Sequence, residues 1–345
     1  MSGTSLDGLD FACCQFDLIN GNYKYNIAVA ETIAYTHEWK ERLITAPRLP
    51  GDDLIRLHKA YGKFIAGSLL QFLESNQIDA GLIASHGHTI FHQPNEQFTF
   101  QLGDGASIAA LTGIDTVSDF RSIDLALGGQ GAPLVPIGDE LLFREFDFCL
   151  NLGGFANISF SRMEQRIAYD LGPVNIVLND LAGRIGEAYD ESGEMGRSGQ
   201  INAQLLNKLN ALEFYKMMPP KSLGREWIEI NIRPLLSDDS ITIPDRLRTF
   251  YEHIACFISA AIKPNRKVLV SGGGAHNHFL MELIREKSRG EFIVPDKLLV
   301  DFKEALVFAF LGLLRTTGHI NTLKTVTGAG INSIGGCVYK GNRSE

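Results

Sequence analysis

The sequence lacks the features that mark several large classes of proteins. Its five cysteines are odd in number and form no CxxC pair, which argues against a disulfide scaffold and against a zinc site. No apolar run is long enough to span a bilayer, and the small, polar N-terminal residues do not resemble a signal peptide. A formal net charge of −8 gives no general attraction to nucleic acid or to an anionic membrane. We therefore expect a cytoplasmic protein with reduced thiols and with neither nucleic acid nor a membrane as partner.

The length of 345 residues exceeds one ordinary core and fits two domains. Strand-like and helical segments alternate in both halves, which predicts α/β domains. Residues 11–18 and 25–33 read as strands joined by a hairpin turn at Asn20-Gly21-Asn22, and 52–75 has the apolar spacing of a helix. No low-complexity linker separates the halves, so we place the boundary in a tight hinge, with one domain over 1–135 and the second over 136–345. The segment 217–239 contains three prolines and reads as an irregular surface excursion of the second domain.

Two glycine-rich turns, at 3–8 and 151–157, each lead into a strand-like segment. Glycine lets the backbone approach a ligand closely, and consecutive free N–H groups form an anion site. The two turns suggest two similar domains that bind one polyphosphate between them. Thr4 and Ser5 could donate to phosphate oxygens and Asp7 could hold Mg²⁺ through water, although an ordinary surface turn explains the first segment equally well. The turn contains no lysine and is therefore not a P-loop.

A third glycine segment, Gly272-Gly273-Gly274, follows an apolar strand and precedes a helix. This context fits a backbone pressed against the base or ribose of a nucleotide. The alternative is a tight strand-to-helix turn. Three consecutive glycines lose more chain entropy than such a turn requires, which favours the nucleotide contact.

Several polar residues have both a chemical and a structural interpretation. Asp170 ends a short strand, where it can cap the following helix or act as a general base. Arg121 can donate two hydrogen bonds to a carboxylate or phosphate, or it can pair with an aspartate and stabilise the hinge. Glu304 lies at a helix N-terminus, where the dipole alone favours an acid. His86 and His88 share a strand face but lack a complete ligand set, so hydrogen bonding is favoured over zinc.

Together these segments resemble the anhydro-N-acetylmuramic acid kinase family. The matching segments follow the family's order along nearly the whole chain. They are MSGTSLDGLD (1–10), SHGHTIFHQP (85–94), QLGDG (101–105), DFRSIDLALGGQGAPLVP (119–136), NLGGFANIS (151–159), YDLGPVN (169–175), SGGGAHN (271–277), KEALVFAFL (303–311) and TGA (327–329). The family belongs to the sugar kinase, heat-shock chaperone and actin superfamily. The resemblance therefore implies an α/β fold with two related domains, each with an actin-like (ribonuclease H-like) core, and a nucleotide cleft between them.

The resemblance implies a kinase that uses ATP and Mg²⁺. Such a kinase converts 1,6-anhydro-N-acetylmuramic acid and water to N-acetylmuramic acid 6-phosphate in cell-wall recycling, with Asp170 as the catalytic base. The family also implies a homodimer. The alternatives are a kinase for another anhydro sugar and a non-catalytic, nucleotide-gated binding module.

The resemblance also assigns the other site residues. Those expected at the nucleotide are Gly3, Thr4, Ser5, Asp7, Gly8, Asp10, Asn151, Gly153, Gly154, Asn157, Gly272, Gly273, Gly274 and Asn277, with Asp7 at Mg²⁺. Those expected at the amino sugar are His86, Arg121, Gly129, Gln130, Gly131 and Glu304.

Three departures from the family pattern have expected consequences. The apolar strand that usually precedes MSGTS is almost absent, so the first strand of the N-terminal domain appears truncated and we expect the true start to lie upstream of Met1. His88 replaces the common glutamine and changes one hydrogen bond. Leu171 and Val174 replace the usual threonine and glycine and alter the surroundings of Asp170.

Overall fold

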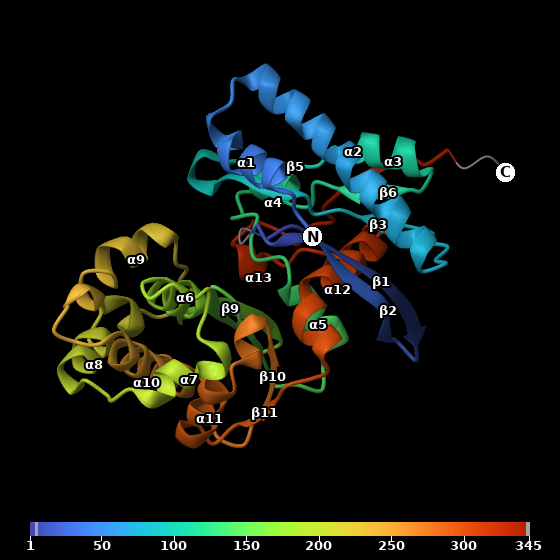
Figure 1. The fold of residues 1–345 in the computed structure, drawn as a ribbon. Coiled ribbons are helices and arrows are strands. Elements are labelled where there is room, and N and C mark those ends of the chain that lie inside the picture. Colours follow the sequence, from blue (N-terminus) through green and yellow to red (C-terminus); the bar gives the residue numbers. More distant parts are fainter. Residues whose placement is uncertain (4–5, 343–345) are drawn as a thin grey trace. The chain divides into compact units, whose positions relative to one another are not determined.

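The structure, a computed structural model, describes residues 1–3 and 6–342 (Figure 1). The chain forms two compact units. The first unit combines Met1–Leu142 with Phe302–Glu345, and the second unit is Phe143–Asp301. The boundary predicted at residue 135, with everything after it in one domain, differs from this division. In the structure the C-terminal segment returns to the first unit.

The return occurs inside one long helix, α12 (Lys297–Thr316). Phe302, with φ −114° and ψ 15°, interrupts its helical backbone at the boundary between the units. Beyond this point α12 packs within the first unit. A Cβ on Gly138 would lie only 2.6 Å from the Val307 side chain, and a Cβ on Gly312 would lie 2.7 Å from that of Ala84. The sequence carries no proline or glycine at the interruption. The helix start expected at Glu304 lies just beyond it, and the structure adds one turn of helix on the other side.

The strands of the first unit form three small sheets. β1 (Gly8–Ile19) and β2 (Asn22–Ala34) make the predicted hairpin, in which Asn20 and Gly21 both have positive φ, as a type I′ turn requires. The other strands are β3 (Ile83–Ala84), β4 (His88–Gln93), β5 (Phe98–Leu102), β6 (Thr116–Ser118) and β12 (Cys337–Tyr339). β4 pairs with β5, and β12, β6 and β3 form a three-stranded sheet in that order. Ser2 bridges to Leu9 and to His88.

The helices of the first unit are α1 (His37–Thr45), α2 (Gly51–Ser75), α3 (Gly105–Thr112), α4 (Ser122–Ala126), α5 (Pro136–Leu142), α13 (Lys324–Thr327) and most of α12. The predicted helical spacing of apolar residues over 52–75 is confirmed in α2. Tyr61, Ile65 and Phe72 on its inner face are at most 3% exposed, and the Phe72 ring stacks on Phe11 of β1.

The second unit is built on one five-stranded sheet in the order β11-β10-β7-β8-β9. Its strands are β7 (Phe148–Leu152), β8 (Phe155–Arg162), β9 (Gln165–Pro173), β10 (Lys267–Ser271) and β11 (Glu291–Ile293). β8 is antiparallel to both neighbours, whereas β10 is parallel to β7 and to β11. Numbered along the chain, the order is 3-2-1-4-5 with the second strand reversed, which is the ribonuclease H-like arrangement. The predicted α/β class is confirmed, and this unit has the predicted core.

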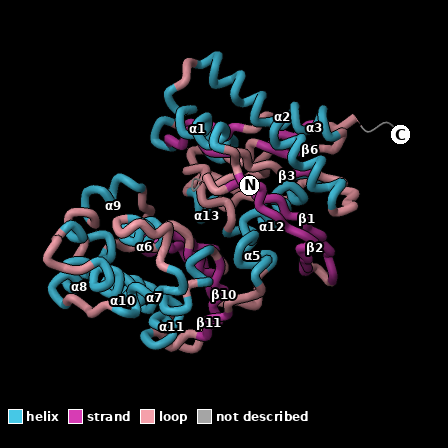
Figure 2. Tube along the Cα trace, in the orientation of Figure 1, coloured by secondary structure: helices cyan, strands magenta, loops and turns pink. Residues whose placement is uncertain are grey.

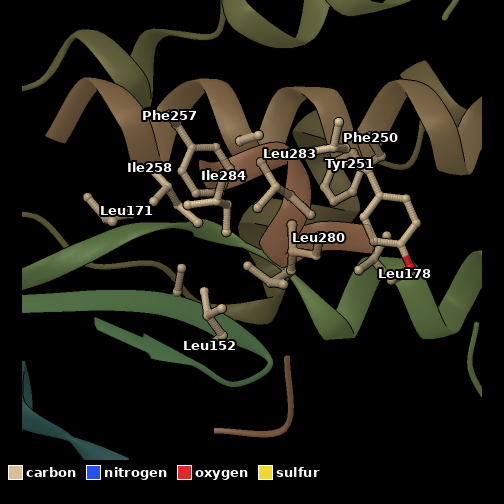
Figure 3. Packing of buried hydrophobic residues seen from close by; sticks show 14 of the residues in the cluster. Leu152, Leu171, Leu178, Phe250, Tyr251, Phe257, Ile258, Leu280, Leu283 and Ile284 are labelled. Carbon is tan, nitrogen blue, oxygen red and sulfur yellow. The ribbon is translucent and has the colours of Figure 1, made fainter. Parts of the chain in front are cut away.

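The helices of this unit pack against the sheet or against one another (Figure 2). They are α6 (Asn175–Gly183), α7 (Glu194–Ser198), α8 (Ala203–Asn210), α9 (Arg225–Asn231), α10 (Ile243–Ala261) and α11 (His278–Lys287). Side chains of α10 and α11 meet the strand residues Leu152 and Leu171 in one apolar core (Figure 3). Burying each such leucine contributes about 1.5–3 kcal/mol. The close approach of α10 also explains Gly172, since a Cβ there would lie 2.7 Å from the Phe257 ring.

The segment 217–239 is more ordered than the sequence predicted. It contains α9, and Ile228, Ile232 and Leu236 are at most 5% exposed within the core of the second unit. These apolar residues recur at helical spacing, which the nearby prolines obscured. Separately, none of the described helices has the combination of length and apolarity needed to cross a bilayer.

Candidate active site

The predicted site residues divide between the two units. The first unit holds Gly3, Asp7, Gly8, Asp10, His86, Arg121, Gly129, Gln130, Gly131 and Glu304. The second holds Asn151, Gly153, Gly154, Asn157, Asp170, Gly272, Gly273, Gly274 and Asn277. Thr4 and Ser5 lie outside the described residues.

Asp170 lies near the end of β9, opposite Asn157 of β8. The register shifts at this point, so Leu171 has no partner of its own on β8. Such a bulge changes the direction in which neighbouring side chains project. Leu171 and Val174 are 3% and 0% exposed and belong to the apolar core. These two departures from the family pattern therefore serve packing beside Asp170.

The Asp170 carboxylate is half-buried and held from one side. Its Oδ2 accepts a hydrogen bond from the backbone N–H of Leu223 at 2.9 Å, and its own N–H donates to the Lys221 carbonyl at 3.1 Å. Burial raises the pKa of Asp170 above its ordinary value, and the Leu223 hydrogen bond opposes that rise. Leu223 could not be identified from the sequence, because a backbone N–H donor places no requirement on the side chain.

Two of the predicted glycine segments lie side by side in the second unit. Ser271, the last residue of β10, pairs in parallel with Asn151 of β7. The Gly153-Gly154 turn and the Gly272-Gly274 segment therefore leave the sheet at neighbouring strand ends. In α/β sheets, ligands bind outside the carboxyl ends of parallel strands.

The three consecutive glycines differ in what surrounds them. Gly272 has φ +82°, and a Cβ there would lie 2.5 Å from Oδ1 of Asn151. A Cβ on Gly274 would lie 2.8 Å from the Leu152 side chain. A Cβ on Gly273 would meet only the Asn175 side chain, at 3.8 Å. Strand packing thus explains the outer two glycines, and the middle one faces space where a ligand could approach.

Asn277 and Asn157 differ in their surroundings. Asn277 caps α11 by accepting from Leu280 N–H at 2.9 Å, and its amide donates to the Tyr251 hydroxyl at 2.8 Å. Both ends of its side chain therefore serve the fold. Asn157 is exposed on β8.

The N-terminal turn places carboxylates at the start of β1. Gly8 is required by packing, since a Cβ there would lie 2.5 Å from the Ile33 carbonyl oxygen. Asp10 accepts from the Thr32 hydroxyl at 2.6 Å. Gly3 and Asp7 are exposed, and no described residue pairs with the Asp7 carboxylate. An exposed carboxylate fits the preference of Mg²⁺ for oxygen ligands and bound water.

His86 and Arg121 form a fixed pair in the first unit. Nδ1 of His86 lies 3.0 Å from the Gly87 carbonyl, which can only accept, so Nδ1 carries the proton. Nε2 then accepts from Nε and Nη2 of Arg121 at 3.1 and 2.8 Å. Burial and the adjacent guanidinium hold the pKa of His86 well below its ordinary value. His86 is therefore neutral at pH 7 and orients Arg121.

The loop at 128–133 is anchored by a residue that the sequence analysis did not single out. Asp124, which is fully buried, accepts from Gly131 N–H and from the Thr327 hydroxyl, each at 2.7 Å. Gln130 N–H donates to the Thr327 carbonyl at 2.9 Å, while the Gln130 side chain is exposed. Nη1 of Arg121 donates to the Gly131 carbonyl at 2.6 Å. The structure thus brings Arg121 together with the predicted sugar-side glycines.

Glu304 projects from α12 next to a buried ion pair between Lys303 and Asp139, at 2.6 Å. The Glu304 side chain is accessible to solvent. Desolvation by the surrounding protein raises the pKa of Glu304, and the charges of Arg121 and Lys303 oppose the rise.

His88 belongs to a separate, buried network. Its Nδ1 lies 2.8 Å from the Ser2 hydroxyl, which accepts from the Tyr35 hydroxyl at 2.6 Å. Tyr35 in turn lies 2.5 Å from the Tyr61 hydroxyl. The histidine that replaces the family's common glutamine therefore makes a structural hydrogen bond. His86 and His88 use their ring nitrogens with different partners, and this geometry does not support a shared metal.

Comparison with known proteins agrees with the resemblance noted in the sequence. A sequence model of the anhydro-N-acetylmuramic acid kinase family matches residues 1–341. An anhydro-N-acetylmuramic acid kinase of Gloeobacter violaceus is 35% identical over 96% of this chain and 94% of its own length. That of Aliivibrio fischeri is 35% identical over 99% of this chain and 98% of its own length.

Among solved structures, an activator of the 2-hydroxyisocaproyl-CoA dehydratase from Clostridium difficile with bound ADPNP has a TM-score of 0.36 and 17% identity. It covers 59% of this chain and 70% of its own. The family match and the curated relatives both extend over nearly the whole chain. The chain therefore belongs to the anhydro-N-acetylmuramic acid kinase family.

Proposed function

We propose that this protein transfers the γ-phosphoryl group of ATP to O6 of 1,6-anhydro-N-acetylmuramic acid while water opens the anhydro ring. The product is N-acetylmuramic acid 6-phosphate. The observation that carries the proposal is the carboxylate of Asp170, half-buried at the end of β9 and held through Oδ2 alone. No described residue donates a hydrogen bond to Oδ1, which leaves this oxygen available to water.

Asp170 takes a proton from water as the water oxygen bonds to C1, and the C1–O6 bond breaks. O6 then bonds to the γ-phosphorus, and the bond to the leaving ADP breaks. A general base contributes about 10²- to 10⁴-fold when its pKa approaches the working pH. The raised pKa of Asp170 moves it in that direction.

The glycine segments of the second unit support nucleotide binding. A Cβ on Gly273 would meet only the end of the Asn175 side chain, and the exposed Gly154 and half-buried Gly153 form the neighbouring turn. Backbone N–H groups in such turns bind phosphate oxygens. Asp7 would hold Mg²⁺ through water, and the ion would neutralise charge on the phosphates.

The loop at 128–133, Arg121 and Glu304 are the proposed sugar side. The guanidinium of Arg121 is fixed by His86 and by Gly131, and its remaining N–H groups can fork onto a carboxylate such as that of the lactyl group. We propose cytoplasmic cell-wall recycling as the setting of the reaction and a homodimer as the assembly.

Release of ADP in the presence of a panel of sugars tests this function. With ATP and Mg²⁺, we expect release that depends on 1,6-anhydro-N-acetylmuramic acid, and much weaker release with levoglucosan, which lacks the lactyl and acetamido groups. Preference for levoglucosan would identify a kinase for another anhydro sugar. Nucleotide binding without release of ADP for either sugar would indicate a binding module.

A further inference from the structure

We propose that the backbone N–H of Leu223 positions the Asp170 carboxylate so that Oδ1, and not Oδ2, takes the proton from water. This inference rests on the proposed function, because it assigns the reacting atom of the proposed base. Leu223 is a positioning residue, because it acts through its contact with the proposed base.

Two contacts from one segment fix the carboxylate. The Lys221 carbonyl accepts the N–H of Asp170 at 3.1 Å, and two residues later Leu223 N–H donates to Oδ2 at 2.9 Å. The first contact fixes the Asp170 backbone, and the second limits rotation of its side chain. The lone pairs of Oδ1 receive no hydrogen bond from the described residues, so this atom remains for the substrate water.

The segment itself is attached to the core of the second unit. Nζ of Lys221 donates to the Phe214 carbonyl at 3.0 Å and lies 4.4 Å from the centre of the Phe214 ring. Phe214 is 4% exposed, and its ring packs against Trp227 of α9. Lys221 therefore fixes the strap, defined here as residues 217–224, next to β9.

The Leu223 contact also sets the pH range in which the base works. An N–H donor favours the charged carboxylate, so it keeps the pKa of Asp170 lower than burial alone would make it. Removing the donor must raise that pKa. A higher pKa keeps the base protonated, and therefore inactive, up to a higher pH.

The sharpest test replaces Leu223 by its α-hydroxy acid, so that an ester oxygen stands in place of the N–H and the side chain is unchanged. We expect the acidic limb of the kcat/KM profile for the anhydro sugar to move up by about one pH unit. The same exchange at Gly224, whose N–H donates to no described residue, is the matched control and should leave the limb in place.

A second measurement does not depend on turnover. The carboxyl carbon of Asp170, labelled with ¹³C and assigned by its loss in Asp170→Asn, should titrate at higher pH in the Leu223 ester than in the wild type. The proposal would be overturned if, in the Leu223 ester, either the acidic limb of the kcat/KM profile or the titration of the Asp170 carboxyl stayed at its wild-type pH. If the wild type does not phosphorylate the sugar at all, the proposed function fails, while the titration still decides whether Leu223 controls the carboxylate.

The attachment of the strap can be tested by ordinary mutagenesis. Lys221→Ala should lower kcat on the order of tenfold, because a loosened strap no longer holds the base, and should move the acidic limb upward in the same direction as the ester. Lys216→Ala, which removes an exposed lysine paired with Glu213 in the same region, is the control. Equal pH profiles for Lys221→Ala and the wild type would contradict the role of the strap.

Discussion

Gly131 donates its backbone N–H to Oδ2 of Asp124 at 2.7 Å, and this hydrogen bond anchors the loop at 128–133, which we propose contacts the sugar. The other carboxylate oxygen accepts from the Thr327 hydroxyl. A Cβ on Gly129 would lie 2.2 Å from Oδ2, so only glycine permits this approach. One buried side chain thus joins two segments that are about 200 residues apart in the sequence.

We predict that Asp124→Asn weakens both the fold and sugar binding. An amide cannot accept at both positions, so a donor is left without its acceptor at a cost of about 1–3 kcal/mol. Denaturant unfolding should show this loss, and KM for the sugar should rise while nucleotide affinity changes little. Asp52→Asn, on the surface of α2, is the control and should change stability by less than about 0.5 kcal/mol. If Asp124→Asn has the wild-type KM for the sugar, the loop at 128–133 does not form part of the sugar site.

Substitutions at neighbouring glycines should separate nucleotide binding from folding. Gly273→Val enters space occupied in the described structure only by the end of Asn175, so we expect a near-normal Tm and at least about a tenfold loss of ATP affinity. Gly274→Ala should instead lower Tm, because its Cβ would press on Leu152. Calorimetric titration with ATP and thermal unfolding measure the two effects. Unchanged ATP affinity in Gly273→Val would reject the nucleotide assignment.

His88 should make the fold sensitive to acid. Burial lowers the pKa of His88 to about 4. The unfolded chain, with an ordinary value of about 6.5, binds a proton first, so stability is full above pH 6.5 and falls as the pH decreases towards 4. At pH 5 the loss from this residue is about 2 kcal/mol.

The variant His88→Gln removes this titration and keeps a side chain that can form a hydrogen bond. We expect its stability to fall less between pH 7.5 and pH 5 than that of the wild type, by about 2 kcal/mol. Other buried histidines shift in the same direction, so some pH dependence will remain. Urea unfolding at both pH values measures the difference. Parallel losses in the two proteins would show that His88 is accessible to protons in the folded state.

The sequence predicted features whose cause is local. The apolar spacing of α2 and the Asn-Gly turn between β1 and β2 act over a few residues, and both are confirmed. The glycine segment at 272–274 was recognised from its strand and helix neighbours. The structure adds that strand packing alone accounts for Gly272 and Gly274.

Features that depend on distant contacts could not be predicted. The sequence placed a helix start at Glu304, close to the interruption at Phe302, but it did not show that the chain returns to the first unit there. The role of Asp124 depends on its contacts with Gly131 and Thr327, and nothing in the sequence around Asp124 indicates those contacts. The donor to Asp170 is a backbone group, and any residue type at position 223 except proline could provide it.

The most direct test of the central claim, that Asp170 activates water in a sugar kinase reaction, is the identity of the product formed in H₂¹⁸O. The wild type should yield, in a rapidly quenched turnover, a sugar that has gained one phosphoryl group at O6 and one ¹⁸O at C1. Asp170→Asn should bind ATP with near-normal affinity and form no such product. A phosphorylated sugar with its anhydro ring intact, or full activity in Asp170→Asn, would contradict the account.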